Sequence, residues 1–268
     1  MALPLRDDLP TRRVPWVTLA LIAANVVIFL FVQPSAFQNP PRANQRYSFS
    51  EAARQREADE YTFRWGAVPC ELFSGKQLAD RPSGCTEDVP SIPLPTDKSV
   101  YLTLLTCIFL HGSVAHVGGN MLFLWVFGNN VEDRLGWARY LVLYLVGGVA
   151  ATLGFAVVNQ HEAVPLVGAS GAIAAVMGAY LVFHPKGRIL TVISTAAFQV
   201  VYVPAVVVLA LFFVTQFLTH ENGVAWEAHV AGMAFGIAVA LVVRFLPSGR
   251  RRAALDRADV ALRAGADF

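Results

Sequence analysis

The residue with the best setting for nucleophilic chemistry is Ser170, which lies between Gly168 and Gly171 in the sequence Gly-Ala-Ser-Gly. It stands at the start of an apolar run that extends to Phe183 without a charged residue. Small neighbours leave the hydroxyl accessible, and a serine becomes a strong nucleophile when a base takes its proton. The same small residues also suit close packing of membrane helices, so this motif alone does not establish chemistry.

Two further groups of polar residues interrupt apolar segments. His116 and Asn120 are four residues apart, so on a helix they would share one face. His229 is followed by Gly232 and Gly236, and these three positions form one stripe of a helix. A histidine in an apolar helix is a candidate general base, and a packing or pore role is the plainer alternative.

The composition indicates a membrane protein with several spans. Of 268 residues, 55% are hydrophobic and only 15% are charged, whereas soluble domains carry about 25% charged residues. A net charge of +2 does not favour a nucleic-acid partner. The three cysteines are divided between a polar loop and an apolar segment, and no Cys-x-x-Cys occurs. We therefore expect a chain embedded in a lipid bilayer, with no metal site and no cofactor.

Apolar segments predict an all-α polytopic membrane protein with six transmembrane helices. The uncharged run 99–131 would form a helix of about 50 Å, too long for a bilayer core of about 30 Å. We expect a break near residues 111–113, with residues 100–110 in or near the interface. The run 189–218 is also too long, and its first third is expected along the membrane surface. The six predicted spans are residues 16–32, 115–129, 140–158, 167–183, 202–218 and 228–243.

Basic residues predict the orientation of these spans. The two short turns at 159–166 and 219–227 contain no Lys or Arg, which places them outside and both termini in the cytoplasm. We expect an integral protein of a prokaryotic plasma membrane. Its parts would be a cytoplasmic segment 1–15, a membrane domain 16–246 with a long outer loop 33–98, and a basic cytoplasmic tail 247–268. A signal peptide is the alternative for the first span, although the remaining chain is itself multi-spanning.

This topology brings distant polar residues to the same depth. The second, fourth and sixth spans all enter from outside, so His116, Asn120, Ser170 and His229 would all lie in the outer leaflet. Polar groups inside a membrane are costly and usually functional. Small residues on the fourth and sixth spans would let these helices approach closely, which would carry His229 to Ser170.

The outer loop contains two of the three cysteines, Cys70 and Cys85. Disulfides persist outside the cytoplasm, and closing a loop of this length would stabilise the fold by about 3 kcal/mol. We predict a Cys70–Cys85 disulfide, with two free thiols as the alternative.

Together these motifs resemble those of the rhomboid intramembrane serine proteases. The similarity covers the second to sixth spans, about half the chain. It rests on an ordered set: Phe109-Leu110-His111, His116-x-x-x-Asn120, Glu132-x-Arg134-x-Gly136, Gly168-Ala169-Ser170-Gly171 and His229-x-x-Gly232-x-x-x-Gly236.

The resemblance implies a six-helix rhomboid-like bundle and a serine endopeptidase with a Ser–His dyad. Ser170 would be the nucleophile and His229 the general base. Asn120, His116 and the backbone N–H of Ser170 would stabilise the oxyanion, and His111 would brace the first loop. The substrate would be a single-pass membrane protein, cut in or near the outer end of its helix.

The sequence departs from the family pattern at two places, one beside the expected base histidine and one in the first loop. Many members carry an aromatic residue four positions after the serine, where this chain has Ala174. We therefore expect His229 to be held loosely, or by a ring from another position such as Phe235, Tyr202 or Trp226. The Trp-Arg pair common in the first loop of the family is also absent.

Two other functions remain alternatives at this point. A non-catalytic rhomboid-like protein would bind or extract membrane helices, and labelling of Ser170 by a serine-directed reagent would distinguish it from a protease. A small transporter would line a path with the same polar residues, but such folds usually show an internal repeat, and none is evident between the two halves.

Overall fold

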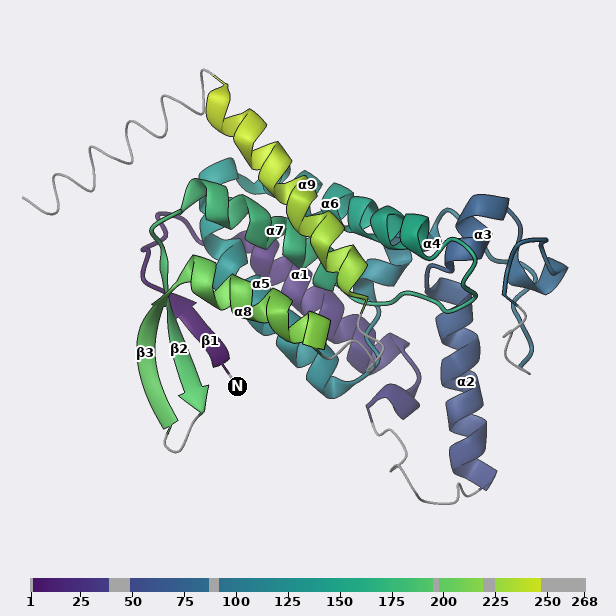
Figure 1. The fold of residues 1–268 in the computed structure, drawn as a ribbon. Coiled ribbons are helices and arrows are strands. Elements are labelled where there is room, and N and C mark those ends of the chain that lie inside the picture. Colours follow the sequence, from purple (N-terminus) through teal and green to yellow (C-terminus); the bar gives the residue numbers. More distant parts are fainter. Residues whose placement is uncertain (1, 39–48, 87–91, 195–197, 219–224, 247–268) are drawn as a thin grey trace, which may run out of the picture.

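A computed structural model describes residues 2–38, 49–86, 92–194, 198–218 and 225–246. It shows a bundle of helices with a small β-sheet at one end and the helices of the outer loop at the other (Figure 1). The predicted cytoplasmic tail, 247–268, lies outside the described residues.

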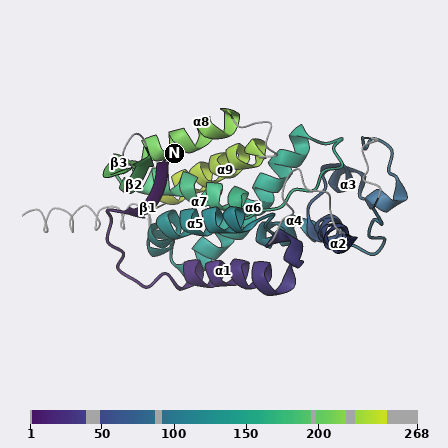
Figure 2. The same cartoon turned by 90° about the horizontal axis from the view of Figure 1, so that it is seen from below.

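The helical bundle is arranged around α7, whose residues from Gly171 to Tyr180 are all buried. Helices α5, α6 and α9 pack against it, and α1 packs on the far side of α5 (Figures 1 and 2). The helices of the bundle are α1 (Trp16–Val27, extended by a π-helical turn Ile28–Val32), α5 (Val114–Leu135), α6 (Trp137–Val158), α7 (Ser170–Phe183), α8 (Ala205–Leu218) and α9 (Trp226–Phe245).

Each of the six segments predicted to span the membrane forms a helix in the bundle. Within the described residues, α6 and α9 are long and apolar enough to cross a membrane. A third candidate span is the bent pair made by residues 103–109 and α5, whose axes differ by 94°. The first part of this pair contains α4 (Thr103–Thr106) and a 3₁₀ turn (Cys107–Phe109). The predicted break near residues 111–113 is confirmed, while the count of six spans stays a prediction.

The prediction of an all-helical chain is wrong at the end of the bundle opposite the outer loop. Strands β1 (Ala2–Asp7), β2 (Arg188–Ser194) and β3 (Phe198–Pro204) form an antiparallel sheet in the order β1-β2-β3. The segment 188–204 is rich in Val, Ile and Thr, which favour strands. The expected surface segment is therefore a β-hairpin, and α8 begins at Ala205 rather than at Tyr202.

Glycines allow α7 and α9 to pack with their backbones almost in contact. A Cβ atom added to Gly232 would lie 2.2 Å from the carbonyl oxygen of Gly171, and one added to Gly236 would lie 1.9 Å from that of Ala175. Such distances leave no room for any side chain. The stripe of small residues therefore sets the close approach of these two helices, as the sequence predicts.

The N-terminus of α1 is attached to the end of α5 by Glu132. Its carboxylate accepts hydrogen bonds from the backbone N–H groups of Val17 (2.9 Å) and Thr18 (2.8 Å) and from the Thr18 hydroxyl (2.8 Å). The first N–H groups of a helix have no partner inside the helix, and a carboxylate there is also favoured by the helix dipole. Glu132 therefore fixes α1 against the helix that carries His116 and Asn120.

The outer loop forms a folded unit built from α2 (Phe49–Trp65) and α3 (Pro69–Ser74). Cys70 and Cys85 are joined by a disulfide, with their Cα atoms 5.4 Å apart. A buried ion pair joins Lys98 to Glu71, and Lys98 also donates to the carbonyl of Phe63 at 2.7 Å. Burial lowers the pKa of Lys98, and the Glu71 carboxylate opposes that shift.

Backbone hydrogen bonds attach this outer unit to the segment that precedes Ser170. Ala67 N–H donates to the carbonyl of Leu166 at 3.1 Å, and Leu166 N–H donates to the carbonyl of Ala67 at 2.8 Å. The outer loop thus helps to fix the segment that leads into the N-terminus of α7.

Candidate active site

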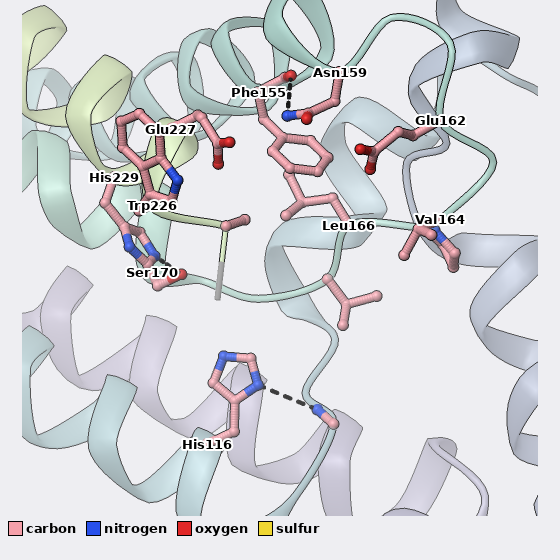
Figure 3. A pocket seen from close by; sticks show the side chains of 14 residues that line it. His116, Phe155, Asn159, Glu162, Val164, Leu166, Ser170, Trp226, Glu227 and His229 are labelled. Carbon is pink, nitrogen blue, oxygen red and sulfur yellow. Dashed lines mark hydrogen bonds between the residues drawn. The ribbon is translucent and has the colours of Figure 1, made fainter. Parts of the chain in front are cut away.

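Ser170 and His229 meet although they are 59 residues apart in the sequence. Ser170 is the first residue of α7, and His229 lies in the first turn of α9. The Nε2 atom of His229 is 2.7 Å from the Oγ atom of Ser170 (Figure 3). This distance is that of a hydrogen bond, and it is the arrangement that a serine nucleophile and its base would need.

The turn before Ser170 requires glycine at position 168. Gly168 has φ +135°, a backbone conformation that side chains disfavour. A Cβ atom at this position would lie 3.0 Å from Nε2 of His116 and 3.5 Å from Oγ of Ser170. The imidazole of His116 and the hydroxyl of Ser170 therefore converge on the space that the missing side chain leaves open.

The start of α5 holds the two residues expected to stabilise an oxyanion. The Ser113 side chain accepts a hydrogen bond from the backbone N–H of His116 (3.1 Å) and caps the helix. Nδ1 of His116 accepts from the backbone N–H of Gly112 at 3.4 Å, so the other ring nitrogen is the N–H donor. Asn120, one turn later, is buried, and its Nδ2 atom has no hydrogen-bond partner among the described residues.

The N-terminus of α7 adds backbone donors to this group. Because Ser170 is the first residue of the helix, its N–H has no intrahelical partner. The helix dipole also favours negative charge at this end. His116, Asn120 and the N–H of Ser170 thus come from two helices that begin on the same side of the bundle.

A cavity of about 590 Å³ opens beside Ser170 and His229. Apolar side chains such as Phe155 and Trp226 line it together with the carboxylates of Glu162 and Glu227 (Figure 3). The carboxylates give this cavity a polar part, through which water can reach a hydroxyl that is otherwise partly buried. Among the described residues, no three His, Cys, Asp or Glu side chains are grouped so that they could hold a metal ion.

His111 lies behind the site and has no exposed surface. Its backbone N–H donates to Oε1 of Gln33 and its carbonyl accepts from Nε2 of Gln33, both at 2.9 Å. Its ring packs edge-on against that of His116, with centroids 5.1 Å apart. These contacts connect the end of the first helix to the start of α5 and suit the bracing role that the sequence suggests.

Two residues of α8 that were not proposed from the sequence contact His229. Nδ1 of His229 forms a hydrogen bond with Oε1 of Gln216 on α8, and the ring of Phe212 on the same helix lies 5.9 Å from the imidazole, centroid to centroid. Of the two alternatives left open by the sequence, a loosely held histidine or one held by other groups, the structure shows the second. Ala174 is fully buried, so the position leaves no open space for a ring.

The contact of Gln216 with His229 was not predicted from the sequence, although the position of the amide in an apolar helix pointed to a buried partner. An isolated amide near the end of an apolar helix is costly in a membrane unless it has a partner. The helix that contains it was correctly located, but helix position alone does not show which neighbour the amide faces.

Comparison with known proteins agrees with this geometry. A Rhomboid domain model matches residues 98–245, more than half of the chain. The chain is 28% identical to RHOMBOID-like protein 1 of Arabidopsis thaliana over 170 residues, which cover 62% of this chain and 39% of the relative. It is 31% identical to Presenilin-associated rhomboid-like protein A, mitochondrial, of Danio rerio over 150 residues, 53% of this chain and 38% of the relative.

A third relative aligns with a shorter part of the chain. Rhomboid protease GluP of Bacillus subtilis is 41% identical over 78 residues, which cover 29% of this chain and 15% of the relative. The aligned regions thus span less than half the length of each of these three curated relatives. The domain match over most of the bundle, including α5, α7 and α9, shows that this chain belongs to the membrane-embedded rhomboid family.

Proposed function

We propose that the protein is an intramembrane serine endopeptidase that uses a Ser170–His229 dyad. The observation that carries this proposal is the 2.7 Å contact between Ser170 Oγ and His229 Nε2 beside a cavity lined by apolar side chains and two carboxylates. The presence of a protease among the relatives supports the same reaction class. The proposed substrate is a single-pass membrane protein whose scissile bond lies in or near the outer end of its helix.

The proposed reaction proceeds through an acyl-enzyme. His229 Nε2 accepts the proton of Ser170 as Oγ attacks the scissile carbonyl, and the same nitrogen then donates that proton to the leaving amine. The carbonyl oxygen becomes an oxyanion, to which His116, Asn120 and the N–H of Ser170 would donate hydrogen bonds. Water entering through the cavity then hydrolyses the ester, and His229 acts again as base and acid.

The test is cleavage of a panel of transmembrane reporter substrates by the purified protein in lipid vesicles. We expect Ser170→Ala and His229→Ala each to reduce cleavage to background. The double variant should be no worse than either single one, because residues that act as a unit are not additive. Ser74→Ala, which changes a serine on the outer loop, serves as the matched control and should cleave normally.

Labelling with a fluorophosphonate separates this proposal from a non-catalytic role. An enzyme with an activated serine should be labelled at Ser170, and the label should be lost in His229→Ala. Cleavage that persists in Ser170→Ala would refute the mechanism. A folded protein that neither cleaves nor becomes labelled would instead favour a rhomboid-like protein that binds or extracts helices.

We further propose that both termini face the cytoplasm of a prokaryotic cell, with the site open to the outer side. The absence of Lys and Arg from the two short turns supports this orientation. Asp80 in the outer loop and Lys186 between α7 and β2 are both exposed. Single cysteines at these positions should react with an impermeant thiol reagent from outside at residue 80 only. The reverse pattern would contradict the orientation.

A further inference from the structure

The inward face of α8 is apolar except at one position. The outward face carries Val206, Val207, Leu211 and Val214, all exposed at the surface of the bundle. On the inward face, Val208 and Leu209 are buried, followed one turn later by Phe212 and one further turn later by Gln216. Gln216 is itself buried, with 8% of its surface exposed. A buried amide on such a face needs a hydrogen-bond partner to offset its desolvation.

The partner of Gln216 is the imidazole of His229. The Oε1 atom of the amide contacts Nδ1 of the ring. An amide oxygen only accepts hydrogen bonds, so this contact places the ring proton on Nδ1. The other nitrogen, Nε2, then carries a lone pair, and it is this atom that lies 2.7 Å from the Ser170 hydroxyl. The amide thus selects the tautomer in which histidine can act as a base.

We propose that Gln216 is a positioning residue that holds His229 in the orientation and tautomer required to activate Ser170. This inference rests on the proposed serine protease function. The arrangement is a serine, a histidine and a neutral amide supplied by three helices, α7, α9 and α8. Hydrolases with a carboxylate in the third place obtain both orientation and charge stabilisation of the imidazolium. A glutamine supplies the orientation without adding a charge to the membrane interior.

Phe212 supports the same placement by packing against the imidazole. Its ring lies 5.9 Å from that of His229 and 5.0 Å from that of Phe123 on α5, both in tilted contacts. Phe212 and Gln216 are four residues apart and share one face of α8. One side chain packs against the imidazole and the other hydrogen-bonds to it, so α8 restrains two directions of ring movement.

The experiment compares Q216L, which removes both polar atoms, with Q216E, which keeps an acceptor at the same reach. The matched control is V214A, an exposed position on the same helix. Two rates are measured: labelling of Ser170 by a fluorophosphonate, and cleavage of a transmembrane reporter substrate in vesicles. The cleavage parameters kcat and KM are followed from about pH 5 to 9, and thermal unfolding checks that each variant is folded.

Loss of the acceptor should slow both reactions without weakening substrate binding. We expect Q216L to lower the labelling rate and kcat on the order of 10²-fold with KM nearly unchanged, because misplacement of a catalytic group has effects of that size. Q216E should remain active near neutral pH. In Q216E, the acidic limb of the pH profile of kcat should move to higher pH by about one unit or more. A carboxylate beside an imidazole favours the protonated ring, so the base loses its proton only at higher pH.

Other titratable groups near the imidazole stay constant in these variants. They are His116 on α5, Glu162 in the turn before α7 and Glu227 on α9. A shift of the acidic limb seen only in Q216E is therefore attributable to the new carboxylate. Wild-type rates in V214A would exclude a general effect of altering α8.

Three results would overturn the inference. Wild-type labelling and kcat in Q216L would show that the amide has no role in catalysis. A Q216E protein as inactive as Q216L would show that an acceptor at this position does not suffice. If the wild-type protein neither cleaves substrate nor becomes labelled at Ser170, the proposed function fails and the inference fails with it. A labelled, active wild type with an unaffected Q216L removes only the inference.

Discussion

Gly236→Ala tests whether the close approach of α7 and α9 assembles the site. The added Cβ atom would lie 1.9 Å from the carbonyl oxygen of Ala175, and ordinary contact begins at 3.4 Å, so the helices would have to separate there by about 1.5 Å (3.4 − 1.9 Å). The neighbouring atoms are backbone, so no side chain can rotate away. The strain must therefore be relieved by movement of a helix.

This movement would reach the candidate dyad. His229 lies seven residues before Gly236, about 10 Å along the helix axis. If the separation is transmitted along α9, the 2.7 Å contact between His229 and Ser170 grows to roughly 4 Å, beyond hydrogen-bond range. We expect cleavage to fall on the order of 10²-fold. Overpacking costs about 1–3 kcal/mol, and the better helix propensity of alanine offsets about 1 kcal/mol of it.

The assay pairs thermal unfolding in detergent with the rate of reporter cleavage in vesicles. Gly118→Ala on α5 is the matched control, because a Cβ atom at that exposed position would meet nothing within 4 Å. The control should be as stable as the wild type or slightly more stable, and fully active. Wild-type stability together with wild-type cleavage in Gly236→Ala would refute the argument that backbone contact between α7 and α9 sets the dyad geometry.

Three further predictions concern other parts of the molecule. Asn120→Ala should lower kcat by about 10²–10³-fold through loss of one oxyanion donor, and a wild-type kcat at saturating substrate would contradict that role. Cys85→Ser should destabilise the outer loop by about 3 kcal/mol, measured as a lower unfolding midpoint that reductant does not lower further. Burial raises the pKa of Asp7 to about 6, so its contribution to stability is present at low pH and is lost as pH rises through 6. Asp7→Asn should therefore reduce the fall in the unfolding midpoint between about pH 4 and 7, and an unchanged fall would refute this.

The sequence by itself determined the helical elements of the bundle. A long uncharged run can satisfy its backbone groups in a bilayer within its own segment only as a helix, and each of the six predicted spans contains one. Excess length also revealed the break before α5, because a single helix of 33 residues would be much longer than the bilayer core. These are local properties, and local properties can be read without knowing which elements are neighbours.

The sequence also indicated that Ser170 and His229 lie close together. Ser170 begins a helix next to a glycine, and His229 occupies a stripe with two glycines. Small residues are needed where helix backbones touch, so the glycines beside Ser170 and His229 predicted that their two helices pack closely together. The structure adds the 2.7 Å separation and the ring nitrogen involved.

Only the tertiary structure showed which strands form the sheet and which side chains contact His229. Ala2 pairs with Ile193, far along the chain. The composition of residues 188–204 favours strands, but no local pattern shows which distant segment pairs with them. Gln216 likewise contacts a ring 13 residues away on another helix, and Phe212 is one of several aromatic residues that could have been the neighbour. Which side chain faces the imidazole depends on the rotation and tilt of α8 against α9. Those are set by packing over the whole bundle, and a helical period in one segment carries no information about them.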